Sequence, residues 1–112
     1  MELIEVSRDR DTAIIKPQLK RIDASVALAF KEAVLEVVAS GEKAVVLDLE
    51  MVQFMDSSGL GAIVSVLKAL GTRGTLAVCN VKGAVLSLFK LTRMDKVFVI
   101  ADTPSDAIEK LS

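Results

Sequence analysis

The chain has 112 residues, 52% of them hydrophobic and 26% charged, with a formal net charge of −1. This composition predicts one folded domain, and the nearly balanced charge argues against binding to nucleic acid or to an anionic membrane. Histidine is absent and Cys79 is the only cysteine. Ser-His-Asp catalysis, Cys-His catalysis, histidine-ligated metals and an internal disulfide are therefore excluded.

Targeting signals and cofactor motifs are also missing from the sequence. No apolar run reaches the roughly 18–20 residues of a membrane-spanning helix, and no basic stretch followed by an apolar run begins the chain. No glycine-rich phosphate-binding or dinucleotide-binding motif occurs. We therefore expect a cytoplasmic protein without membrane insertion, without a bound metal and without a cofactor.

The first third of the chain predicts two strands followed by a helix. Residues 2–7 and 12–16 favour strands, and the short charged turn between them predicts a hairpin that ends at Pro17. Residues 18–22 are expected to form a loop. Asp23 is then expected to cap a helix that Gly41 closes. The apolar stripe of this helix consists of Val26, Phe30, Ala33, Val34 and Val37.

The remaining two thirds alternate strands with helices. The apolar runs at 44–49, 75–79 and 97–100 predict buried strands. Helical spacing of apolar residues predicts helices over 57–70 and 84–91, and a last helix that begins at Pro104 behind a cap at Asp102 or Thr103. The order ββαβαβαβα predicts a single α/β domain over residues 1–112, with a mixed, mostly parallel sheet of about five strands and about four helices.

The segment 54–61 joins a predicted strand to a predicted helix and concentrates polar residues and glycines. Asp56, Ser57 and Ser58 can each cap a helix, but one cap is enough. Gly59 and Gly61 disfavour a helix, so they either let another molecule approach the backbone or allow close packing of the helix on its sheet. A hydroxyl at a helix N-terminus also suits phosphorylation, because the helix dipole tolerates the added charge.

This segment, with residues 44–49 and 88–98, resembles the STAS domain of bacterial anti-sigma factor antagonists. The resemblance extends over the whole chain and implies a non-enzymatic switch. The unmodified protein would bind an anti-sigma factor that is also a serine kinase, and so free a sigma factor. The kinase would phosphorylate Ser58 and release the complex, and a serine phosphatase would reset it. Ser57 is left as the hydroxyl with a structural role.

The resemblance also implies a partner-binding surface. We expect it to consist of Asp23, Met55, Asp56, Ser57, Gly59, Leu60 and Gly61. The loop before Asp23 departs from the family, whose members usually carry a glycine there.

Several alternatives remain beside the phosphorylation switch. The chain could be a STAS regulatory or structural subunit of another signalling or lipid-transport complex, in which the serines only cap and dock. An enzyme ranks lowest, since no nucleophile and base can be paired without histidine or a second cysteine. Asp48 and Asp56 could form a Mg²⁺ site, but no third ligand is in view. Cys79 is expected to be a buried structural thiol.

Overall fold

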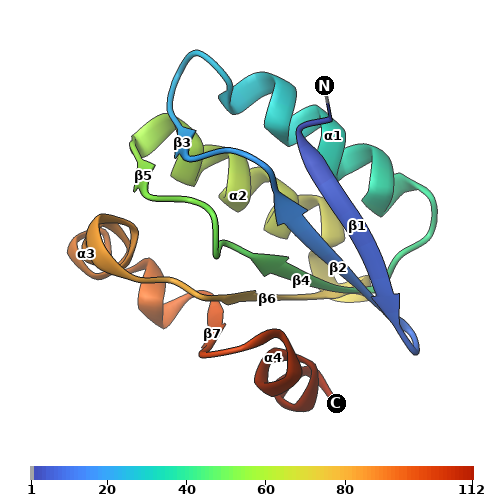
Figure 1. The fold of residues 1–112 in the computed structure, drawn as a ribbon. Helices are drawn as coiled ribbons and strands as arrows, with labels where there is room; N and C mark the ends of the chain where they lie inside the picture. The colour runs from blue at the N-terminus through green and yellow to red at the C-terminus, as the bar shows by residue number, and fades with distance from the viewer. Residues whose placement is uncertain (1) are drawn as a thin grey trace.

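The computed structural model describes residues 2–112, and its centre is a five-stranded sheet with the strand order β1-β2-β4-β6-β7 (Figure 1). Strand β1 is antiparallel to β2, and the other neighbours in this sheet are parallel. This is the mixed, mostly parallel sheet that the alternation of elements predicted. The strands are β1 Ile4–Asp9, β2 Thr12–Pro17, β4 Ala44–Asp48, β6 Thr75–Cys79 and β7 Val99–Ala101.

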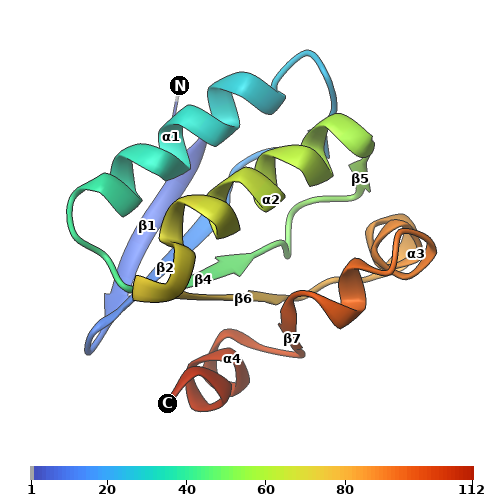
Figure 2. The same ribbon diagram turned by 180° about the vertical axis from the view of Figure 1, so that it is seen from behind.

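Helices cover both faces of this sheet. Helices α1 (Ala27–Ala39) and α2 (Ser57–Leu70) lie side by side on one face, and α4 (Pro104–Leu111) lies on the other (Figure 2). Helix α3 (Gly83–Leu91) lies beyond the end of β6, and two short 3-10 turns, Gly71–Arg73 and Met94–Lys96, complete the chain. The predicted α/β class and four helices are confirmed.

The hydrophobic core is divided by the sheet. Val45 and Leu47 of β4 belong to the large cluster under α1 and α2, together with Phe30 and Ile63, whereas Val46 belongs to a smaller cluster under α4. Successive strand residues point to opposite faces, so a strand covered on both sides needs an unbroken apolar run. This explains why the apolar run at 44–49 correctly indicated a buried strand.

A second, two-stranded sheet was not predicted. Residues Arg21–Ile22 form β3, which pairs in parallel with β5, Phe54–Met55. Both segments were assigned to loops, because two residues are too few to show a strand period. This small sheet matters for the site, since it brings the chain around Asp23 beside the segment 54–61.

Two predictions about element ends were wrong. Asp23 does not cap α1, which begins at Ala27 after Val26 without any side-chain cap. The Asp23 carboxylate instead accepts hydrogen bonds from the backbone N–H and the hydroxyl of Ser25, so it stabilises the turn before the helix.

The last strand was also predicted too early and too deeply buried. Strand β7 begins at Val99, and the side chains of Val97 and Val99 are 53% and 38% exposed. The 3-10 turn after Arg93 carries the chain to Lys96, and β7 is an edge strand with a neighbour on one side only.

Other boundaries agree with the sequence. Helix α2 and strand β6 have the predicted ends, and Thr103 caps α4 by accepting a hydrogen bond from the Asp106 N–H at 3.1 Å. Strand β1 is an exception, because it begins and ends two residues later than predicted. Only Arg10 and Asp11 form the turn, and Arg10 adopts a left-handed conformation with φ of +58°.

Candidate functional site

Asp56 organises the N-terminus of helix α2. Its backbone is extended, and its Oδ1 atom accepts hydrogen bonds from the N–H groups of Ser58, at 2.9 Å, and Gly59, at 3.1 Å. A side-chain cap of this kind stabilises a helix by about 1 kcal/mol. Of the three residues that could cap this helix, Asp56 is therefore the one that does.

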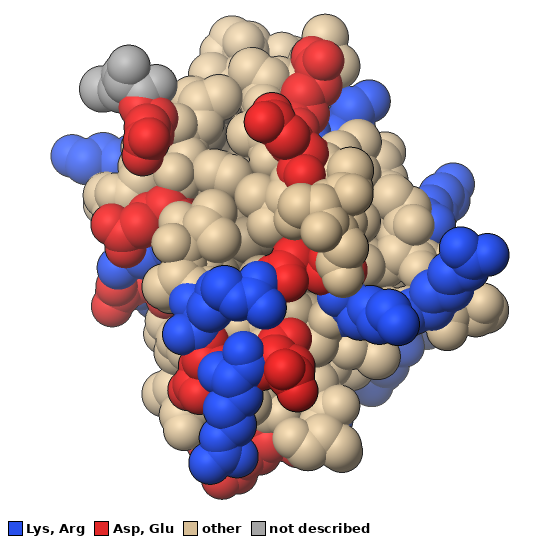
Figure 3. Space-filling view, turned by 90° about the vertical axis from the view of Figure 1, so that its right-hand side faces the viewer, with Lys and Arg blue, Asp and Glu red and all other residues tan. Residues whose placement is uncertain are grey.

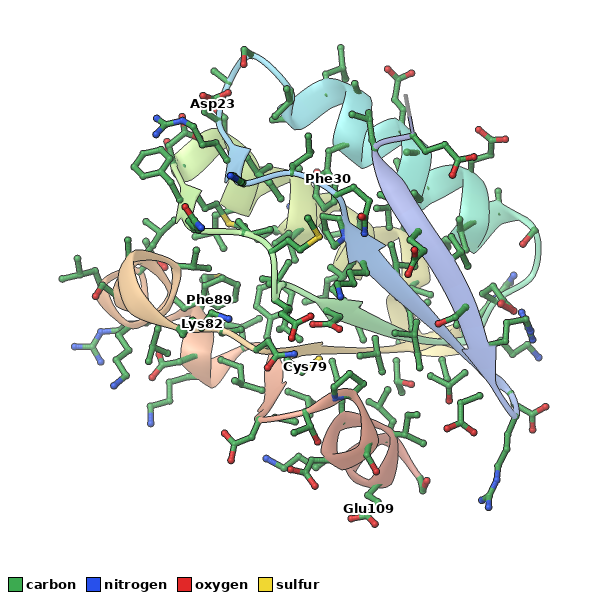
Figure 4. The ribbon with its side chains drawn as sticks, in the orientation of Figure 1. Asp23, Phe30, Cys79, Lys82, Phe89 and Glu109 are labelled. Atoms are coloured by element: carbon green, nitrogen blue, oxygen red, sulfur yellow. The ribbon has the colours of Figure 1, made fainter. Side chains whose placement is uncertain are left out.

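The same carboxylate connects two segments that are far apart in the sequence. Its Oδ2 atom accepts a hydrogen bond from the Ala24 N–H at 3.3 Å, and the Asp56 N–H donates to the Ile22 carbonyl at 3.4 Å. The turn that follows β3 is thereby held against the start of α2. Asp23 lies at the start of this turn, directly after β3 (Figure 4).

Both serines of the segment are exposed, and neither hydroxyl makes a hydrogen bond with any residue between 2 and 112. The structural role expected for Ser57 is therefore wrong, because Asp56 already provides the cap. The serines differ in direction. Ser58 lines a groove between α1 and α2 with a volume of about 310 Å³, and Ser57 is not part of its lining.

The groove beside Ser58 is built mainly from small residues and carries one charge. Lys31 of α1 is the only charged residue in the lining, and Leu28, with an exposed fraction of 62%, lies beside it. The other lining residues are Ala24, Ala27, Gly61, Ala62 and Ser65. A group attached to the Ser58 hydroxyl would therefore find open space and one ammonium group.

The two glycines of the segment have different tasks. A Cβ added to Gly59 would lie 2.2 Å from the Ile22 carbonyl oxygen and 2.8 Å from the Met55 side chain. A Cβ added to Gly61 would have no atom within 4 Å. Of the two explanations that the sequence left open, close packing is confirmed for Gly59, and approach of another molecule at Gly61 stays a prediction. Gly59 allows close packing of α2 on β3, and Gly61 keeps the groove wall bare.

Burial divides the residues that were expected to bind a partner. Ser57 and Gly61 are exposed, and Asp23 and Asp56 are half-buried. Met55, Gly59 and Leu60 are buried, so their side chains offer almost no surface for a partner. Partner binding by these three residues stays a prediction, and it would act through the shape that they give to the exposed residues.

The sequence did not single out Arg21 and Phe54, which lie beside the segment on the β3–β5 sheet. The Arg21 guanidinium lies 4.3 Å from the centre of the Phe54 ring and 3.7 Å from the Asp23 carboxylate. Hydrogen bonds from Ser25, assisted by the charge of Arg21, hold the pKa of Asp23 below its usual value. The only available signal was a basic residue two positions before Asp23.

Asp48 lies apart from this site and is already satisfied. Its Oδ1 atom accepts hydrogen bonds from the Asn80 side chain at 2.8 Å and from the Glu50 N–H at 3.1 Å. Within residues 2–112, no three His, Cys, Asp or Glu side chains are gathered so that they could hold a metal ion. The neighbouring Cys79 is buried as predicted, and burial and the Asp48 charge raise the pKa of its thiol to about 12 (Figure 4).

Comparisons with known proteins agree on one family. The STAS domain family matches residues 4–107. An anti-sigma F factor antagonist of Paenibacillus polymyxa is 38% identical over 68 residues, which are 60% of this chain and 58% of that protein. The crystal structure of an anti-sigma factor antagonist from Mycobacterium paratuberculosis is 28% identical, with a TM-score of 0.88 over 96% of this chain and 92% of that one.

A more distant structure has the same fold. The anti-sigma factor antagonist SpoIIAA, whose structure is known in unphosphorylated form, is 19% identical with a TM-score of 0.71, over 96% of both chains. The structure of the Bacillus protein SpoIIAA in its phosphorylated form has a TM-score of 0.70, over 97% of this chain and 99% of that one. Among the helices of residues 2–112, none combines the length and apolar character needed to cross a membrane.

Proposed function

This chain belongs to the STAS domain family, and we propose that it is an anti-sigma factor antagonist whose binding to an anti-sigma factor is controlled by phosphorylation of Ser58. The observation that carries this proposal is the free Ser58 hydroxyl, which is exposed at the start of α2 and lines the α1–α2 groove. The names of the relatives support the partner class, and the phosphorylated form of SpoIIAA supports the modification.

In this proposal the unmodified protein binds an anti-sigma factor that is also a serine kinase, and a sigma factor is released. The kinase transfers the terminal phosphoryl group of ATP to the Ser58 oxygen, with release of ADP and of the hydroxyl proton, and the complex dissociates. A serine phosphatase restores the hydroxyl. The proposed contact surface consists of the exposed start of α2, the turn after β3, and the Arg21–Phe54 pair.

The geometry explains how phosphorylation would change binding without unfolding the helix. A phosphate adds about −1.5 to −2 charges and three acceptor oxygens. The Asp56 carboxylate already occupies the N–H groups of Ser58 and Gly59, so the phosphate cannot use them without displacing the cap. It would project into the groove, where Lys31 offers partial neutralisation. The surface that a partner meets would thus become more negative while the fold persists.

Intact mass spectrometry tests the acceptor. After incubation with the cognate kinase and ATP, the mass of the protein should rise by one phosphate. Ser58→Ala should abolish this rise, and Ser57→Ala, the matched control on the neighbouring hydroxyl, should keep it. A mass increase that survives Ser58→Ala would refute the assignment.

Binding tests the switch itself. Ser58→Asp adds a negative charge at the groove and should weaken binding to the anti-sigma kinase, whereas Ser58→Ala should bind as the wild type does. If all three proteins bind the kinase equally, phosphorylation does not control the contact. The chain would then be an unswitched regulatory or structural subunit. Co-purification with a membrane transporter in place of a kinase would point the same way.

A further inference from the structure

A second groove lies between strand β1 and helix α1, on a different part of α1 from the Ser58 groove. It has a volume of about 800 Å³. Ile4, Val6 and Arg8 line it from one face of β1, at every second residue, as expected for a strand. Ala33, Glu36 and Val37 line it from one stripe of α1, at helical spacing, and Ser40 lines it directly after the helix. The groove is thus bounded by a strand face and a helix stripe.

The floor of this groove is apolar and includes an unusually exposed side chain. Val6 is 44% exposed, and Leu3, Ile4, Ala33 and Val37 also line the groove. Strand β1 is also an edge strand, because within the described range 2–112 its only neighbour in the sheet is β2. An edge strand presents unpaired backbone N–H and C=O groups that another strand can bind. Both features favour an extended segment as the occupant.

The charges around the groove are mostly negative. Among residues 2–112, Glu2, Glu36 and Glu42 line it against one cation, Arg8, and that guanidinium is already paired with the Glu42 carboxylate. Glu36 makes no ion pair with any residue in the described range 2–112. Figure 3, which looks onto this side of the molecule, shows acidic side chains along two borders of an uncharged surface.

We propose that the β1–α1 groove binds an extended segment of a partner protein in which the residues that face the groove, at every second position, are in turn apolar and basic. The segment would add a strand beside β1. Its apolar side chains would cover Val6 and Val37, and its basic side chains would pair with Glu36. Six residues of β1 give a contact of about 20 Å. A second copy of this chain fits less well, since a two-fold contact would set the same acidic lining against itself.

This site would act independently of the proposed phosphorylation of Ser58. The Ser58 groove is lined by residues of α1 up to Lys31, and the β1–α1 groove by residues from Ala33 onward. One partner could therefore occupy each groove at the same time. A failure of the phosphorylation assays would leave this proposal untouched, and the reverse is also true.

The test uses two synthetic peptides and two measurements. A fluorescein-labelled eight-residue peptide of two valine-serine-lysine-serine repeats, which places valine and lysine on one strand face, is titrated with the protein and followed by fluorescence anisotropy. The peptide with glutamate in place of lysine is the charge control. Amide chemical shifts of the isotope-labelled protein then map the binding site. We expect saturable binding of the basic peptide only, weakening with salt, with shifts confined to β1 and the second half of α1.

Three variants make the test specific. Val6→Lys places a charge on the groove floor and should weaken binding roughly tenfold, and Glu36→Lys should weaken it about fivefold. Glu109→Lys is the matched control, because Glu109 is exposed on α4 across the sheet (Figure 4), and it should leave affinity unchanged. Amide spectra show whether each variant is folded. If Val6→Lys does not fold, Glu36→Lys, which lies on the helix surface, still tests the proposal.

Several results would overturn the proposal. These are equal binding of the acidic peptide, equal binding by Glu36→Lys, chemical shifts outside the groove, or no saturable binding of the basic peptide. The oligomeric state of the free protein, measured by sedimentation, could also overturn the proposal. A dimer that Val6→Lys dissociates would show that the groove is an interface between two copies of this chain.

Discussion

The segment 54–61 contains two sets of residues that are close in sequence and opposite in environment. Met55, Gly59 and Leu60 are buried, and Gly59 lies directly against the backbone of β3. Ser57, Ser58 and Gly61 are exposed. The two serine hydroxyls make no hydrogen bond in the described part of the chain, and a Cβ added to Gly61 would meet no atom within 4 Å. Asp56 stands between the two sets and hydrogen-bonds to both the helix and the turn after β3.

This difference shows that one short segment combines residues that fix the helix in place with residues that form its exposed surface. The buried set fixes where α2 begins, and the exposed set presents a hydroxyl and bare backbone at that position. Substitutions should therefore separate cleanly. Changes in the buried set should lower the free energy of unfolding, and changes at the two exposed serines should alter modification or binding while stability stays nearly constant.

Gly59→Ala should have the largest effect on stability. The new Cβ would lie 2.2 Å from the Ile22 carbonyl oxygen, which is backbone and cannot rotate away. Overpacking of this kind typically costs 1–3 kcal/mol, so we expect a loss of about 3 kcal/mol in the free energy of unfolding. Urea denaturation measures it. A loss below about 1 kcal/mol would mean that α2 can shift away from β3, and the packing role of Gly59 would be wrong.

Asp56→Ala should have the next largest effect. It removes the acceptor for the N–H groups of Ser58, Gly59 and Ala24, and we expect a loss of about 1.5 kcal/mol. Thermal unfolding measures this effect as a lower midpoint. Ser57→Ala is the control, since its hydroxyl has no partner within residues 2–112, and it should leave the midpoint in place. A similar loss for Ser57→Ala would contradict the assignment of the cap.

The fold was largely predictable because long apolar runs decide it. Helix α2 and strand β6 could be placed to the residue, since Gly71 and Gly74 mark where one ends and the other begins. The β3–β5 pair could not be found, because it joins two-residue strands that are 33 positions apart and show no period. Asp23 has the right chemistry for a cap, but its carboxylate is used by Ser25 before the helix starts.

The position of the candidate site in the chain was predictable, but the role of each residue in it was not. Sequence alone could not separate Ser57 from Ser58, because both lie at the start of the same helix. In the structure only Ser58 lines the α1–α2 groove. That groove exists because α1 lies beside α2 and contributes Lys31 to its lining. In the same way, Gly59 and Gly61 look alike until β3 is placed under one of them.

Gly61→Ala should have a smaller effect of opposite sign. The added methyl group would meet no atom within 4 Å, and alanine favours a helix over glycine, so stability should rise by about 0.5–1 kcal/mol. Urea denaturation of Gly61→Ala and Gly59→Ala under the same conditions measures the difference between their free energies of unfolding. Under the proposed function, the same methyl group would narrow the groove and slow phosphorylation of Ser58. A loss of stability would show that Gly61 also has a packing role.

Lys31→Met should have the smallest effect, and it reports on the exposed set alone. If the phosphate of modified Ser58 lies in the α1–α2 groove, the nearby ammonium group favours its doubly charged form and lowers its second pKa. An exposed pair of this kind contributes about 0.5 kcal/mol, which corresponds to roughly 0.4 of a pKa unit. Removing the Lys31 charge should therefore raise the second pKa of the phosphate, which ³¹P NMR follows across the pH range.

Lys68→Met is the control. Lys68 lies on α2 but outside the groove lining, so this variant should leave the phosphate pKa unchanged. An equal pKa in the wild type and Lys31→Met would place the phosphate outside the groove and in contact with solvent alone. The charge that a partner meets at the start of α2 would then be the full charge of the phosphate.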